Sequence, residues 1–205
     1  MITLNGNGVL TGINEEIKSD ENKIKQISCH FRKIMEVLGL DMEDDNLKDT
    51  PDRVARMYVK EIFSGLNPAN NPEITLFSNQ YSFRQMIVAK NIPVYSYCEH
   101  QFVPIIGNAH VAYYSMGKVI ELTKIKSIIQ YYCKRPQVQE RLTEQIADAL
   151  KEVLHTQDVA ILIDARIIRE APGGLNDLNS STVTNHFSGK FIGEVNRKEF
   201  LSFLK

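Results

Sequence analysis

The pattern of apolar and polar positions divides the chain into a helical first third and a mixed remainder. Residues 14–40 carry apolar side chains at helical spacing, which predicts an amphipathic helix. A second helix is predicted from Thr50, because Thr50, Pro51 and Asp52 supply an N-cap, a proline in the first turn and an acidic residue behind it. We therefore expect residues 1–66 to form an N-terminal helical segment.

The remainder of the chain alternates between strand and helix patterns. Two amphipathic helices are predicted over residues 123–134 and 137–155, and a short one at the C-terminus. Strand-like segments, rich in β-branched and aromatic residues, surround them: ITLF, MIVAKNIPVYSYC, FVPIIGNAHVAYYSM, KVIEL, DVAILIDARIIRE and STVTNHFSGKFIG. This order predicts an α+β domain over residues 67–205, with helices on one face of an antiparallel sheet.

Composition excludes several classes of partner. The formal net charge of −1 provides no broad basic field for a nucleic-acid backbone. No apolar run approaches the roughly 20 residues that cross a bilayer, and the N-terminus lacks the pattern of a signal peptide, so we expect no membrane partner and a cytoplasmic location. The three cysteines, an odd number, argue against a disulfide framework.

Three segments carry a resemblance to a known family. They are DTPDRVARMYVKEIFSGL (49–66), CEHQFVPIIGNAHVAYYSMGKVIELTKI (98–125) and RPQVQERLTEQIADAL (135–150). Together they resemble GTP cyclohydrolase I, and the similarity runs from Lys48 to the C-terminus. The resemblance implies the tunnelling fold and a homo-oligomer, usually a decamer built from two pentamers, with active sites between subunits. It also implies a reaction that opens the imidazole ring of GTP and yields dihydroneopterin triphosphate.

The family's zinc ligands are the Cys and second His of a Cys-Glu-His-His motif and the Cys of a later His-x-Cys motif. The first motif reads here Cys98-Glu99-His100-Gln101, so a glutamine stands where the second histidine is expected. In the later motif, the resemblance places Ile167 at the histidine and Arg169 at the cysteine. A permanently charged guanidinium cannot replace a thiolate ligand. We therefore predict no metal ligands and no zinc cofactor, with Arg169 among the substrate contacts.

The resemblance assigns the base-reading contacts to Glu140 and Gln139. A carboxylate suits the guanine edge, because it offers two acceptor oxygens to the adjacent N1-H and 2-amino donors, and a pterin presents the same edge. We therefore expect a guanine nucleotide, a deazapurine or a pterin as the ligand. Further substrate contacts are expected from Lys124, Thr123 and Arg53, whereas two arginines of the family fall on Ser127 and Gly173.

Cys98 and His100 are the predicted catalytic residues. A cysteine after an apolar strand is on its own more often a buried structural thiol. Within the motif it is a candidate nucleophile, and His100 a candidate proton-transfer group. The leading hypothesis is an enzyme that acts on a guanine- or pterin-type ring without zinc. The alternatives are an authentic GTP cyclohydrolase I with a rearranged metal site, and an inactive paralogue that binds ligand and regulates, or co-assembles with, an active enzyme.

Overall fold

The computed structural model describes residues 3–4, 10–11, 19–168 and 180–205. These residues form two compact units, Met1–Leu66 and Asn67–Lys205. Within the described ranges, no helix is both long and apolar enough to cross a membrane. The chain combines helices and strands as the pattern predicted, and the α+β class is confirmed.

Two helices dominate the first unit. Helix α1, Asp20–Val37, begins after Ser19, whose side chain accepts a hydrogen bond from the Asn22 backbone amide. Helix α2, Thr50–Arg56, continues into a π-helical turn, Met57–Ile62. Its N-cap is Asp49, one residue before the predicted cap, and Pro51 occupies the first turn. The unit also contains a short antiparallel pair, β1 (Thr3–Leu4) with β2 (Leu10–Thr11).

A five-stranded sheet forms the frame of the second unit, in the order β7-β4-β5-β8-β9. Four strands are antiparallel, and their bounds are Met86–Cys98 (β4), Pro104–Tyr114 (β5), Val159–Ile167 (β8) and Thr182–Phe187 (β9). The fifth, β7 (Pro136–Gln137), runs parallel to β4 and pairs with its last residues. A separate small sheet joins β3 (Leu76–Ser78) to β6 (Lys118–Ile120).

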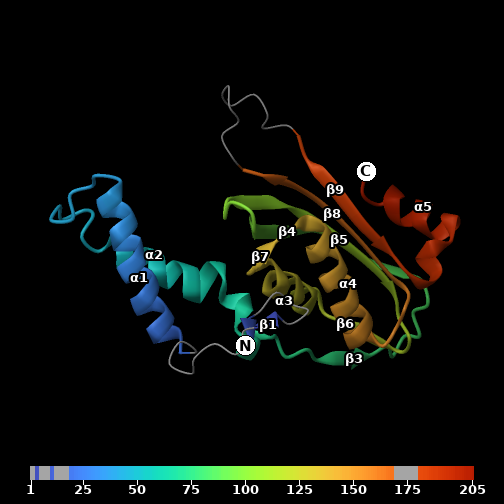
Figure 1. Ribbon diagram of the computed structural model, residues 1–205. Coiled ribbons are helices and arrows are strands. Elements are labelled where there is room, and N and C mark those ends of the chain that lie inside the picture. Colours follow the sequence, from blue (N-terminus) through green and yellow to red (C-terminus); the bar gives the residue numbers. More distant parts are fainter. Residues whose placement is uncertain (1–2, 5–9, 12–18, 169–179) are drawn as a thin grey trace. The chain divides into compact units, whose positions relative to one another are not determined.

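Helices cover both faces of this sheet, and Figure 1 shows α3 and α4 on one side and α5 on the other. Helices α3 (Leu122–Cys133) and α4 (Gln139–Leu154) bury their apolar stripes against alternate residues of β4, β5 and β8. Helix α5, Glu194–Ser202, inserts Phe200 into a second cluster on the opposite face. The two long helices α3 and α4 share one face of the sheet, as predicted, and α5 packs on the other.

A bulge interrupts the pairing of β4 with β5 between Ala89 and Ile92. Asn91 adopts a left-handed backbone conformation there, with φ at 58°. Its backbone amide donates to Nδ1 of His110, across a distance of 3.3 Å. The His110 side chain in β5 therefore stabilises the bulge, because it accepts the hydrogen bond of a backbone amide that has no partner in the strand pairing.

Candidate active site

The predicted catalytic residues lie in a tight turn between β4 and β5. Cys98 is the last residue of β4, and its backbone amide and carbonyl are bonded to Val103 and Phe102, at 2.9 and 2.8 Å. The Glu99 amide donates to the carbonyl of Gln137 in β7, at 3.0 Å. The turn is thus fixed on two sides, by its own hairpin and by the neighbouring parallel strand.

Cys98 and His100 are in contact across this turn. The Cys98 thiol is buried, with 5 % of the residue exposed, whereas the His100 side chain is 71 % exposed. Sγ of Cys98 lies 3.7 Å from Nδ1 of His100. The other ring nitrogen, Nε2, lies 4.0 Å from Oε1 of Glu99. Three consecutive residues therefore bring together a thiol, an imidazole and a carboxylate.

Glu99 is held in turn by Arg141, a residue that the sequence analysis did not single out. Nη2 of Arg141 donates to Oε2 of Glu99 and, at 2.8 Å, to the carbonyl of Pro136. Its Nε donates to Oε1 of Gln137, at 3.0 Å. Gln137 belongs to β7 and Arg141 to the first turn of α4, so helical spacing does not predict their contact, which appears only in the folded chain.

The two residues predicted to read the base begin α4, but they face different surroundings. Gln139 is buried, and its Nε2 donates to the carbonyls of Ile163, at 3.0 Å, and Thr182, at 2.7 Å. This amide joins α4 to β8 and β9. Glu140 is exposed in the first turn of the helix. Of the pair, Glu140 therefore presents its side chain to solvent, and Gln139 uses both donor hydrogens inside the chain.

The residues predicted to meet the phosphates lie in two separate parts of the chain. Lys124 lies in the first turn of α3, and its Nζ donates to the Glu73 carbonyl at 3.1 Å. Beside it, the hydroxyl of Thr123 donates to Glu121, also at 3.1 Å. Arg53 belongs to the first unit, where Nη2 donates to the carbonyl of Asn46 at 2.9 Å. Arg169 and Gly173 lie outside the described residues.

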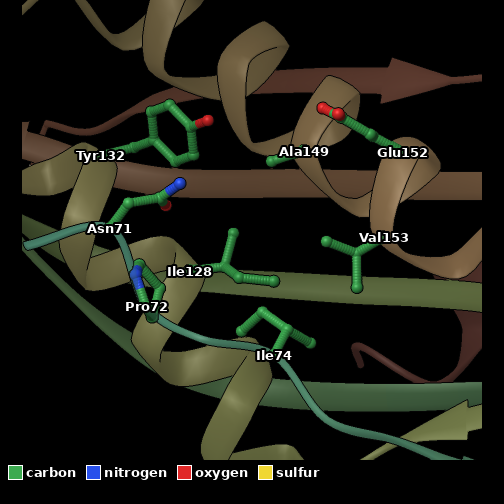
Figure 2. Close-up of a pocket in the computed structure, with 8 residues that line it drawn as sticks. All are labelled: Asn71, Pro72, Ile74, Ile128, Tyr132, Ala149, Glu152 and Val153. Carbon is green, nitrogen blue, oxygen red and sulfur yellow. The ribbon is translucent and has the colours of Figure 1, made fainter. Parts of the chain in front are cut away.

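The other two cysteines and a helix-lined pocket are not part of this turn. Cys29 is exposed, whereas burial raises the pKa of the Cys133 thiol to about 12. Figure 2 shows a pocket of about 180 Å³ beneath the segment that leads to β3. Eight residues of that segment, α3 and α4 line it, and none of the predicted site residues is among them: Asn71, Pro72, Ile74, Ile128, Tyr132, Ala149, Glu152 and Val153.

The separation of Cys98 and His100 fits two ligands of a zinc ion. Thiolate and imidazole ligands bound at ~2.3 and ~2.1 Å in a tetrahedral arrangement are separated by about 3.6 Å. The observed 3.7 Å between Sγ and Nδ1 matches that separation. Among the described residues, no group of three or more His, Cys, Asp or Glu side chains is arranged so that it could hold a metal ion. The turn therefore provides two of the ligands of a zinc site.

Comparison with known proteins identifies the family. Residues 27–205 match the GTP cyclohydrolase I family. Proteins named GTP cyclohydrolase 1 are similar along most of their length. The protein from Flavobacterium johnsoniae is 52 % identical over 91 % of this chain and 84 % of its own. Those from Aeromonas hydrophila and Haemophilus ducreyi are 46 % and 43 % identical, over 98 % and 96 % of this chain and 93 % and 91 % of theirs.

These comparisons correct the prediction about the cofactor. Relatives at this level of identity imply the zinc of the family, so the expectation of no cofactor is wrong. The prediction counted ligands by motif position alone, at Gln101 and Arg169. It did not take into account that Nδ1 of His100 and Sγ of Cys98 are separated by the distance expected between two ligands of the same zinc ion.

The fold, the extent of the match and the turn between β4 and β5 that carries Cys98 and His100, called here the reactive turn, all indicate the same family. An antiparallel sheet with helices packed against it is the frame of the tunnelling fold, and the Cys98 turn stands at the end of its longest strand. A match that covers residues 27–205 includes the whole second unit, residues 27–66 of the first, and every described site residue. The chain is an enzyme that belongs to the GTP cyclohydrolase I family.

Proposed function

We propose that this enzyme binds the fused ring of a guanine nucleotide through Glu140 and acts on that ring beside Cys98 and His100. One observation carries the proposal: the first turn of α4 is tied to the reactive turn. Arg141, next to Glu140 in the sequence, donates to Glu99 inside the Cys98 turn. The residue that would read the ring and the residues that would act on it therefore belong to one hydrogen-bonded structure.

Recognition of the ring follows from the position of Glu140. Its carboxylate is exposed in the first turn of α4, a location that favours a negative charge. Two acceptor oxygens match the adjacent N1-H and amino donors of guanine, and a deazapurine or a pterin offers the same pair. Lys124 and Thr123, at the start of α3, are the proposed phosphate contacts of one chain, and Arg53 would be contributed by a neighbouring chain.

The reactive turn supplies the chemical groups. The family's zinc would be held by Sγ of Cys98 together with Nδ1 of His100, and when bound it supplies a water whose pKa is lowered to about 7. Nε2 of His100 is the atom at which this residue would hold a proton, because it faces Glu99 and is open to solvent. Burial of Cys98 limits access of bulk water to the thiol.

Ring opening of GTP is the reaction favoured by the comparisons, since the relatives are named GTP cyclohydrolase 1. Incubation with GTP should release formate and produce a fluorescent pterin after oxidation. Binding of GTP without formate release would favour the inactive paralogue. Formate release from another purine, but not from GTP, would assign a different substrate to the same site.

Glu140 provides the direct test of ring recognition. We expect Glu140→Gln to weaken binding of GTP at least about tenfold, since a hydrogen bond to a charged group is worth roughly 1.5–3 kcal/mol. Isothermal titration calorimetry with guanosine, GMP, GTP, a deazapurine and a pterin measures the loss across ligands. Glu152→Gln, an exposed glutamate later in α4, is the matched control. Equal affinities of both variants and the unmodified protein would refute the role of Glu140.

A further inference from the structure

Arg141 joins two parts of the chain that are 42 positions apart, the turn that contains Glu99 and the consecutive segment of β7 and α4. Its guanidinium donates to Glu99 in the reactive turn, to the Pro136 carbonyl and to the Gln137 side chain. It starts from α4, while Pro136 and Gln137 form β7. A planar guanidinium presents several donors in a fixed geometry, so one side chain can fix these groups relative to one another.

The support behind Arg141 is itself rigid. Gln137 is 1 % exposed, and its Nε2 donates to the Tyr132 carbonyl and to Oε1 of Gln145, both at 2.9 Å. These bonds anchor β7 to the end of α3 and to the second turn of α4. The Gln137 side chain that Arg141 contacts is therefore itself held by two hydrogen bonds.

We propose that Arg141 is a positioning residue for the reactive turn. By holding Oε2 of Glu99, it directs Oε1 of the same carboxylate toward Nε2 of His100, 4.0 Å away. The imidazole is thereby turned so that Nδ1 meets the Cys98 thiol. Carboxylates that orient a functional histidine in this manner typically affect metal affinity or activity 10- to 100-fold when they are lost. The inference rests on the proposed function, because it assigns the reaction to this turn.

The test compares Arg141→Gln with Arg141→Lys and Glu99→Gln. We expect Arg141→Gln to lower kcat about 10- to 100-fold while KM for GTP changes less than about threefold, because the ring contact of Glu140 remains. Arg141→Lys retains the charge without the fork, so it should recover part of the loss. The double variant Arg141→Gln/Glu99→Gln should lose little beyond the larger single loss, because both residues act through one contact.

A second readout does not depend on turnover. In a Cys29→Ser background and with metal removed, iodoacetamide should alkylate Cys98 about tenfold faster in Arg141→Gln, since the turn that covers the thiol opens more readily. Cys133 remains protected by burial in both proteins. Arg56→Gln, which removes an exposed ion pair with Asp52, is the control and should leave kcat and alkylation unchanged.

The outcomes separate a positioning role from a merely structural one. A folded Arg141→Gln protein with unchanged kcat and unchanged Cys98 alkylation would overturn the proposal. A lowered Tm with an unaltered alkylation rate would also overturn it, because that result describes a structural contact. If Glu140→Gln leaves ligand binding intact while Arg141→Gln still accelerates alkylation, the proposed function fails and the inference about the turn survives.

Discussion

At the scale of single residues, the reactive turn concentrates unlike environments within a few positions. The thiol of Cys98 is buried, while His100 next to it is largely exposed. Elsewhere on the sheet, His110 shows the opposite arrangement, because it is partly buried and accepts a backbone hydrogen bond. Because of these surroundings, we expect His100 to affect metal binding and His110 to affect the pH dependence of stability, and each effect can be tested separately.

Metal binding is the first prediction at this scale. We expect about one zinc per chain in the purified protein, and we expect Cys98→Ser and His100→Ala each to lose most of it, because each removes one ligand. Plasma mass spectrometry of dialysed samples measures the content, with Cys29→Ser as the control. A protein purified without zinc, or variants that retain it in full, would contradict the assignment of these ligands.

His110 predicts a dependence of stability on pH. Burial, the largest cause, and Lys90 lower its pKa below 6.5, against the opposing effect of Asp164. Below pH 6.5 the unfolded chain therefore binds more protons than the folded chain. As the pH is lowered from 6.5, the free energy of unfolding decreases until the pKa of His110 in the folded state is reached. Urea titrations between pH 7.5 and about 5 measure the slope.

A matched pair of variants isolates that slope. His110→Gln, which keeps an acceptor for the Asn91 amide without titrating, should flatten the decrease in stability. His30→Gln, on the exposed surface of α1, should leave it unchanged. The same slope in all three proteins would exclude His110 as its source.

At the scale of elements, close packing between β5 and β8 sets a local limit on side-chain size. A Cβ atom at Gly107 would meet the Asp164 carbonyl oxygen and both carbon atoms of Ala165 that face it. Neither backbone can yield without breaking the ladder between the strands. The sequence alone indicated a strand here. That the neighbouring strand requires a glycine at position 107 could not be predicted, because the register between β5 and β8 was not known.

We expect Gly107→Ala to lower the free energy of unfolding by about 2 kcal/mol or more, through overpacking. Chemical denaturation followed by circular dichroism measures the loss. Gly193→Ala is the control, because its added carbon would lie 3.2 Å from the Lys190 carbonyl oxygen, a contact that small shifts relieve. Similar stability of the two variants would show that β5 and β8 separate without cost.

The elements that were predicted correctly share strong local patterns. Helices α3 and α4 and strands β4 and β5 followed from periodicity, because each buries one face. The face on which α5 packs could not be predicted, since a helix pattern does not name its partner. The Cys98 turn was found from its motif, whereas the contact between Glu99 and Arg141 spans 42 positions and appears only in the folded chain.

At the scale of the whole molecule, the single chain leaves apolar side chains of the sheet in solvent. Tyr95, Ile167 and Val183 are 57 %, 47 % and 52 % exposed. Members of this family typically assemble as oligomers. We predict that this chain forms a homo-oligomer, most simply a decamer, whose interfaces cover such residues. Light scattering coupled to size-exclusion chromatography measures the mass, and a monomer that binds GTP with full affinity would contradict a site shared between chains.

The two-residue strand β7 has a consequence for the order in which the chain folds. Among the described residues, it is the only strand that pairs in parallel within the large sheet. Its connection to β4 along the chain includes β5, β6 and α3. Because contacts between distant segments require a longer loop to close, the pairing of Cys98 with Gln137 should form after the hairpin of β4 and β5. During refolding, the circular dichroism of the sheet should therefore recover before protection of the Cys98 thiol.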